Sequence, residues 1–133
     1  MAGNKFGAKK IKDPFTGEVF DSVKEHKRWG VLRLMERAGK ISNLKRQVKY
    51  ELIPTQREKS TEVYKKGPQK GLPKPGVLIE KPCAYVADFE YIDSAGNKVV
   101  EDTKGYKRGP AYDLFAIKRK LMLMVHGIRV KEV

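Results

Sequence analysis

Three charged residues near the middle of the chain have the types and spacing of a metal-dependent hydrolytic site. Asp88 interrupts an otherwise apolar and aromatic stretch, and Asp102 and Lys104 are separated by a single residue. One or two carboxylates commonly hold Mg²⁺ in proteins, with water and substrate phosphate as its other ligands. A lysine beside such a metal can orient a water or stabilise the charge that builds on phosphorus. These residues predict a site that hydrolyses phosphodiester bonds with Mg²⁺ or Mn²⁺.

Two predicted strands joined by a tight turn must position these residues. Residues 84–92 and 98–104 have strand character, and the stretch 93–97 between them contains Gly96, which suits a loop position with positive φ. A hairpin that is symmetric about Ala95 would fix which residues of the two strands face each other.

Strand alternation then decides which side chains meet. Asp102 and Lys104 share one face, while Glu101 points to the other, towards an ion-pair partner or a helix. In the symmetric hairpin Asp88 lies directly opposite Asp102, with Cβ atoms about 5 Å apart. A slip of one residue would bring Glu101 and Thr103 to the site instead. An ordinary solvated hairpin face is the competing interpretation.

The elements around this hairpin predict a mixed α/β (α+β) fold, a small, mostly antiparallel central sheet flanked by helices. A helix is expected over about 21–38, a strand over 47–53, a second helix over 111–125 and a final short strand over 128–133. The order is helix, three strands, helix, strand. The expected apolar stripes of the two helices are Val31, Leu34, Met35 and Ala38 in the first, and Ala111, Leu114, Phe115, Leu121, Met122 and Val125 in the second.

The length of 133 residues is enough for one domain, and we expect residues 1–133 to form it. Residues 1–19 are expected to be a loose basic lead-in. Residues 54–82 form a basic insert rich in proline, glycine and lysine, which cannot bury a core of its own. A loop of this length is typical of a functional or partly disordered segment.

The strongest compositional signal is charge. Twenty-nine Lys and Arg against sixteen Asp and Glu leave a formal net charge of +13, which favours a polyanion partner, most commonly nucleic acid. No apolar run is long enough to span a bilayer, and no signal peptide is expected. A single cysteine, Cys83, fits a reducing cytoplasm. The missing Gly-rich Lys-Ser/Thr loop argues against an ATPase.

Several basic and polar residues are candidates for contacts with a nucleic acid, and each could equally belong to a solvated face. They lie in the insert, in the loop after the hairpin, on the wet face of the first strand and on the second helix. The candidates are Lys65, Lys66, Lys70, Lys107, Arg108, Gln47 and Lys118.

The hairpin also resembles a known family. An acid on one strand, Asp88-Phe89, followed by acid-any-Lys on the next, Asp102-Thr103-Lys104, resembles the PD-(D/E)XK nuclease pattern. Over nearly the whole chain the sequence resembles a group of small phage and prophage proteins of unassigned function in that superfamily. The matching stretches are Phe20-Asp21-Ser22 with Glu25, Ala38 to Leu44 with Gln47, Asp88-Phe89, and Val100 to Gly105 with Tyr112 and Lys118. The chain departs from the pattern in having Ala87 where a proline is usual and in its insert at 54–82.

The resemblance implies a restriction-endonuclease-like core and a Mg²⁺-dependent deoxyribonuclease, active in phage recombination, repair or packaging of DNA in the host-cell cytoplasm. It places Asp88, Asp102 and Glu25 as metal ligands and Lys104 beside them as a catalytic residue. Glu25 also has capping-box spacing to Ser22, so a role of its side chain in capping the helix is an equal alternative to metal binding. The sequence leaves room for a homodimer. The alternative function is a non-enzymatic nucleic-acid-binding or virion assembly protein with a nuclease-like fold.

Overall fold

Four strands form the central sheet of the computed structural model, which describes residues 9–133. β3 (Ser42–Ile53), β6 (Cys83–Ile92) and β7 (Lys98–Asp102) pair antiparallel in that order. β8 (Lys131–Glu132) adds to β7 in parallel. The structure confirms the predicted mixed fold with a mostly antiparallel sheet.

Two helices accompany the sheet, α1 (Val23–Arg37) and α2 (Pro110–His126). The Ser22 hydroxyl caps the start of α1, and Gly39 follows its end with φ of 74°. Gly127 ends α2 in the left-handed region, with φ of 68°. These ends agree with the sequence prediction, because both glycines adopt a conformation that other residues rarely accept. Among the described residues no helix is long and apolar enough to cross a membrane.

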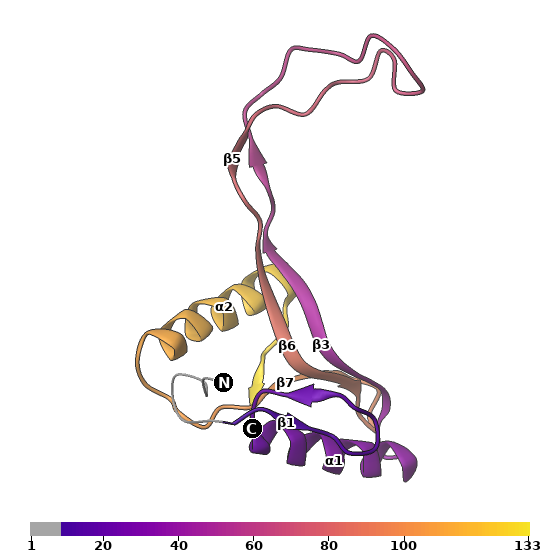
Figure 1. Cartoon of the computed structure of the whole chain (residues 1–133), viewed down its shortest axis with the longest axis vertical. Coiled ribbons are helices and arrows are strands. Elements are labelled where there is room, and N and C mark those ends of the chain that lie inside the picture. Colours follow the sequence, from indigo (N-terminus) through magenta and orange to yellow (C-terminus); the bar gives the residue numbers. More distant parts are fainter. Residues whose placement is uncertain (1–8) are drawn as a thin grey trace.

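The helices cover opposite faces of the sheet, as two neighbouring residues of β7 demonstrate (Figure 1). Val99 packs against the core cluster that contains Leu32 of α1. Val100 belongs to the cluster that contains Phe115 and Met122 of α2. Since neighbouring strand residues point to opposite faces, the hydrophobic core has one layer under each helix.

The buried face of α1 differs from the predicted one. Leu32 is fully buried, whereas Val31 is 46% and Leu34 is 64% exposed. The inward face also carries Glu25 and Arg28, whose charged groups have partners inside the protein. Apolar periodicity alone therefore placed the inward face one position too early, because polar residues with buried partners share that face.

The stripe predicted for α2 is only partly correct. Phe115 and Met122 are buried as expected, but Leu114 and Val125 are about half exposed. The apolar Met124 is also exposed. The helix has more apolar residues than the sheet can cover, so composition could not select the buried ones.

β3 begins five residues earlier than predicted. Its register shifts between Ser42 and Lys45, and both Asn43 and Gln47 have positive φ. A bulge breaks the strict alternation on which a strand prediction rests, which explains why the first half of β3 was missed.

The insert at 54–82 continues the β3–β6 hairpin as a two-stranded arm that projects away from both helices (Figure 1). β4 (Gln56–Arg57) pairs antiparallel with β5 (Leu78–Glu80), and an isolated bridge joins Val63 and Pro73. None of residues 54–82 is buried, as expected of a segment without its own core.

The predicted lead-in over 1–19 is more ordered than expected from Ile11 onwards, while residues 1–8 lie outside the described part. β1 (Ile11–Lys12) and β2 (Val19–Phe20) form a short antiparallel hairpin. The carboxylate of Asp13 accepts two backbone N–H groups of its turn, at 2.8 and 3.0 Å. The hairpin is anchored because Phe20 is fully buried.

Candidate active site

Asp88 and Asp102 face each other across β6 and β7. The pair Phe89–Glu101 fixes the register, and the next step along the ladder brings Asp88 opposite Asp102. Gly96 in the connecting loop has φ of 86°. The structure therefore confirms the predicted symmetric hairpin, and the alternative with a one-residue slip is wrong.

Each aspartate is held by a donor from the protein. The Asp88 Oδ2 atom accepts the backbone N–H and the hydroxyl of Thr103, both at 2.8 Å. The buried Tyr85 hydroxyl donates to Asp102 Oδ2 at 2.6 Å. These bonds fix the orientation of both carboxyl groups before any ligand arrives.

The electrostatics of the pair are unfavourable. Burial, followed by the negative charge of Asp88, raises the pKa of Asp102 to about 7. The Tyr85 hydrogen bond and the Lys104 ammonium lower that pKa but do not cancel the increase. The pair therefore retains negative charge that an additional cation would stabilise.

Lys104 lies just beyond the end of β7 and still reaches the site. Its Nζ atom is 3.3 Å from Asp102 Oδ1 and 4.0 Å from the centre of the Phe115 ring. Its backbone N–H donates to the Val133 carbonyl, and its own carbonyl accepts a 2.7 Å hydrogen bond from Lys24 Nζ. The predicted proximity of Asp102 and Lys104 is confirmed, although Lys104 lies beyond β7 and is held by its contacts with Val133 and Lys24.

Glu25 of α1 approaches the same site from the other side. Its side chain is 3% exposed and accepts hydrogen bonds from Gln47 Nε2 at 3.2 Å and from Arg46 Nη2 at 3.4 Å. Burial, then the charge of Asp88, raises the pKa of Glu25. Ser22 Oγ accepts the Glu25 N–H at 3.1 Å, so the backbone of Glu25 serves the helix cap. Its carboxylate, bonded to Gln47 and Arg46, is turned towards the strands.

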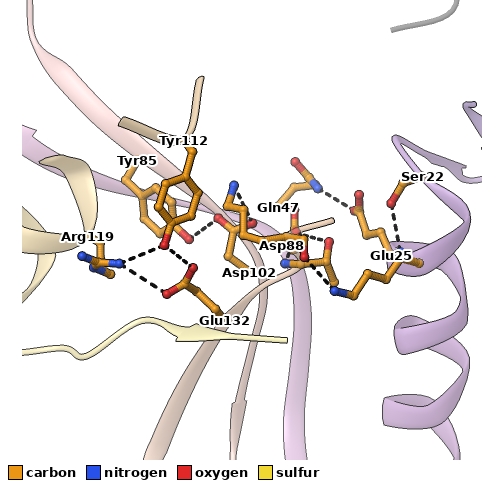
Figure 2. Close-up of polar contacts among 12 residues, drawn as sticks. Ser22, Glu25, Gln47, Tyr85, Asp88, Asp102, Tyr112, Arg119 and Glu132 are labelled. Atoms are coloured by element: carbon orange, nitrogen blue, oxygen red, sulfur yellow. Dashed lines mark hydrogen bonds and ion pairs between the residues drawn. The ribbon is translucent and has the colours of Figure 1, made fainter. Parts of the chain in front are cut away.

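These side chains form a row that runs from α1 across the sheet towards α2 (Figure 2). The row borders an open cavity of about 1050 Å³. Residues that line this cavity include Lys9, Lys24, Glu25, Asp88, Asp102 and Lys104. A cavity lined by both carboxylates and lysines is a suitable environment for a metal-bound phosphate.

The donor set fits a hard divalent cation by its chemistry. Asp88, Asp102 and Glu25 offer carboxylate oxygens, which Mg²⁺ and Mn²⁺ prefer. The charge of Asp88 raises the pKa of both other acids, so Asp88 repels each of them. In residues 9–133 no three His, Cys, Asp or Glu side chains already stand in a metal-binding arrangement. Coordination of one cation by all three carboxylates would therefore require these side chains to move.

The other predicted contact residues lie at different distances from the site. Lys107 and Arg108 are exposed in the loop between β7 and α2, next to Tyr106, which lines the cavity. Lys118 is half-buried along α2. The three arm lysines, Lys65, Lys66 and Lys70, lie near the turn of the arm and not at the cavity.

Sequence reasoning missed several residues that shape the site. Tyr85 lies three residues before Asp88 on β6, and Thr103 directly follows Asp102, but their types alone do not indicate hydrogen bonds to carboxylates. Lys24 precedes Glu25 on α1, and its contact with the Lys104 carbonyl spans eighty residues of sequence. Tyr112, part of the family resemblance, donates to Glu132 at 2.7 Å and so ties α2 to β8.

Comparison with known proteins gives one result. No curated protein and no solved structure matches the chain. A family described as "Protein of unknown function (DUF1064)" matches residues 3–131, nearly the full length. The chain therefore belongs to the DUF1064 family.

Proposed function

We propose that this protein is a divalent-metal-dependent deoxyribonuclease that hydrolyses phosphodiester bonds. The observation that carries the proposal is the facing pair of the half-buried Asp88 and the buried Asp102, with Lys104 in contact with Asp102. Two like charges held face to face destabilise a fold unless a cation joins them. Such an arrangement is expected where the fold serves a metal-binding reaction.

In the proposed site Asp88 and Asp102 hold Mg²⁺ or Mn²⁺, and Glu25 assists. When bound, the metal polarises a phosphoryl oxygen and lowers the pKa of a bound water. Thr103 and Tyr85 keep the two aspartates in place through their hydrogen bonds.

Lys104 has the second role in the reaction. Its ammonium lies within 3.3 Å of Asp102 and can orient the attacking water or stabilise the negative charge that develops on the phosphate. Packing of Nζ over Phe115 restricts the side chain to this side of the site. Lys24, whose Nζ atom is bonded to the Lys104 carbonyl, places further positive charge at the cavity, where a phosphate backbone would enter.

The order of elements supports the family assignment suggested by the sequence. With the short strands of the N-terminal hairpin and of the arm left aside, the order is helix, three strands, helix and strand: α1, β3, β6, β7, α2 and β8. This is the order expected of a restriction-endonuclease-like core, with the acids on the second and third strands. We therefore propose that the chain is related to the PD-(D/E)XK nucleases of phage origin and acts on DNA in recombination, repair or packaging.

Cleavage assays with a matched pair of variants test the proposal. The protein is incubated with labelled linear, nicked and four-way DNA in Mg²⁺, Mn²⁺ or chelator. We expect metal-dependent cleavage by the wild type and by Asp113→Asn, an exposed carboxylate on α2, and none by Asp102→Asn. Asp102→Asn should bind DNA as well as or better than the wild type, because it loses negative charge near phosphate. Binding without cleavage by the wild type on every substrate would favour the non-enzymatic alternative.

A further inference from the structure

The projecting arm, residues 54–82, has no role in the proposed chemistry. Its two strands leave the body where β3 and β6 lose contact with the helices (Figure 1). None of its residues is buried, so the arm contributes no core to the fold. An exposed two-stranded ribbon is only marginally stable by itself, which points to a partner that contacts it.

Backbone hydrogen bonds stabilise the turn at the end of the arm. Tyr64 donates its N–H to the Leu72 carbonyl at 3.0 Å, and Gly71 donates to the Tyr64 carbonyl at 2.8 Å. Lys74 donates its N–H to the Glu62 carbonyl at 2.9 Å. These bonds, with the bridge between Val63 and Pro73, hold the tip in one shape.

Charge is distributed unevenly along the arm. The three acidic residues of the segment, Glu58, Glu62 and Glu80, all lie outside the stretch 63–75. That stretch has four lysines and no acid, and we call it the basic tip; its lysines are Lys65, Lys66, Lys70 and Lys74. The end furthest from the body is therefore purely cationic, which complements a polyanion.

The shape of the arm selects among polyanions. A two-stranded ribbon fits the major groove of B-DNA, which is about 12 Å wide. About fifteen residues separate Leu52, the last buried residue of β3, from Gly67 in the tip. At roughly 3.3 Å per residue this is a reach of up to about 50 Å, more than one helical turn of about 34 Å.

The composition of the arm argues against a single strand as its ligand. Proteins that hold single-stranded nucleic acid stack bases on exposed aromatic rings. Tyr64 is the only aromatic residue of the arm, and Lys74 Nζ lies 5.7 Å from the centre of its ring. The arm therefore offers several lysines for phosphates but a single ring for stacking.

We infer that the arm is a clamp for duplex DNA, whose ribbon follows a groove while the basic tip binds phosphates about one helical turn from the site. The inference rests on the proposed function and names its substrate class, a duplex longer than the site alone requires. A different partner for the arm would be a second copy of this chain, in contact with the exposed Val77, Leu78 and Ile79. The test distinguishes this partner from duplex DNA.

The test compares two triple variants with equal loss of charge. Lys65→Gln/Lys66→Gln/Lys70→Gln removes charge from the basic tip. Lys27→Gln/Lys40→Gln/Lys120→Gln removes the same charge from exposed positions outside the arm and the cavity. Affinity is measured in chelator, where no cleavage occurs, on duplexes of about 10 and about 30 base pairs and on single strands of equal length. Salt dependence is recorded for each.

Near 0.1 M salt, we expect the tip variant to bind the long duplex at least about tenfold more weakly than the wild type does. The slope of log affinity against log salt concentration should be smaller in magnitude by up to about 2.7, for three lost phosphate contacts. The tip variant should match the control variant on the short duplex and on single strands. Equal losses on all ligands, or an unchanged slope on the long duplex, would overturn the inference. The inference would also be overturned if the substitutions in the tip changed the oligomeric state of the protein but not its affinity for DNA. Because cleavage is not measured, loss of nuclease activity alone would leave this result unaffected.

Discussion

Arg28 of α1 and Glu101 of β7 form a bidentate ion pair inside the protein. Arg28 Nε donates to Glu101 Oε1 at 2.8 Å, and Nη2 donates to Oε2 at 2.7 Å. The Glu101 side chain is fully buried, and the Tyr91 hydroxyl also donates to it. Glu25 lies one turn before Arg28, and Asp102 follows Glu101 directly. The pair thus joins α1 to β7, two of the three elements that carry the proposed metal ligands.

Removing Arg28 should destabilise the protein strongly. Arg28→Ala leaves a buried carboxylate without its cation, which typically costs about 3–5 kcal/mol of unfolding free energy. Denaturant unfolding measures the loss, and Arg37→Ala, an exposed arginine on the same helix, serves as the control with a change of about 0.5 kcal/mol or less. Similar losses in both variants would mean that the pair does not anchor α1.

Metal should stabilise the wild-type protein through the facing aspartates. A cation that binds only the folded state, at a hundredfold excess over its Kd, adds about 2.7 kcal/mol. In Asp88→Asn the repulsion with Asp102 is relieved, so this variant should be more stable than the wild type in chelator by on the order of 1 kcal/mol. It should gain little from Mg²⁺ or Mn²⁺ and should not cleave DNA.

Thermal melts of both proteins, each in chelator and in excess metal, measure this interaction. The asparagine side chain introduced by Asp88→Asn retains an oxygen that can accept the Thr103 N–H, so the substitution preserves the local structure. An equal shift of both melting temperatures by metal would place the metal elsewhere.

The raised pKa of Asp102 predicts how stability in chelator depends on pH. The folded state binds this proton more tightly than the unfolded chain, since the pKa rises from 3.8 to about 7. Unfolding free energy should therefore increase as pH falls from about 8 to about 5, by on the order of a few kcal/mol at most. Glu25, whose pKa is also raised, contributes in the same direction.

Asp102→Asn is the control for this dependence. The variant cannot titrate at this position, so its unfolding free energy should vary much less between pH 5 and 8. Denaturant unfolding of both proteins between pH 5 and 8 measures this difference in unfolding free energy. A wild type that is most stable at pH 8 in chelator would contradict the assignment, because the buried acid would then be ionised without strain.

Replacing Lys104 should separate catalysis from metal binding. Lys104→Met keeps the apolar stem that packs near Phe115 but removes the ammonium beside Asp102. Loss of one group that stabilises developing charge typically reduces the rate by about 100- to 1000-fold. Single-turnover cleavage measures this loss, while the metal-induced rise in melting temperature should persist. Lys107→Gln, in the exposed loop, is the control and should leave the single-turnover rate within a few-fold of the wild-type rate. A loss in Lys107→Gln as large as that in Lys104→Met would mean that the rate depends on total positive charge and not on the position of Lys104.

The hairpin at the centre of the site could be predicted from the sequence alone. Its register follows from a short turn with Gly96, and alternation along the strand then sends Glu101 and Asp102 to opposite faces. The structure agrees on each point, with Asp102 beside Lys104 and Glu101 bound to Arg28. Local rules succeed here because the interactions that set the hairpin register lie within fifteen residues or so of one another.

Contacts between distant segments decided the rest. The orientation of the Glu25 carboxylate depends on Arg46 and Gln47, twenty-one and twenty-two residues away, and not on the cap that its spacing to Ser22 suggested. The inward face of α1 is set by the buried partners of its polar residues, which apolar periodicity cannot register. Only the tertiary structure determines that the segment 54–82 extends as an arm. The segment has no core of its own, so the β3–β6 pairing at its base sets its direction.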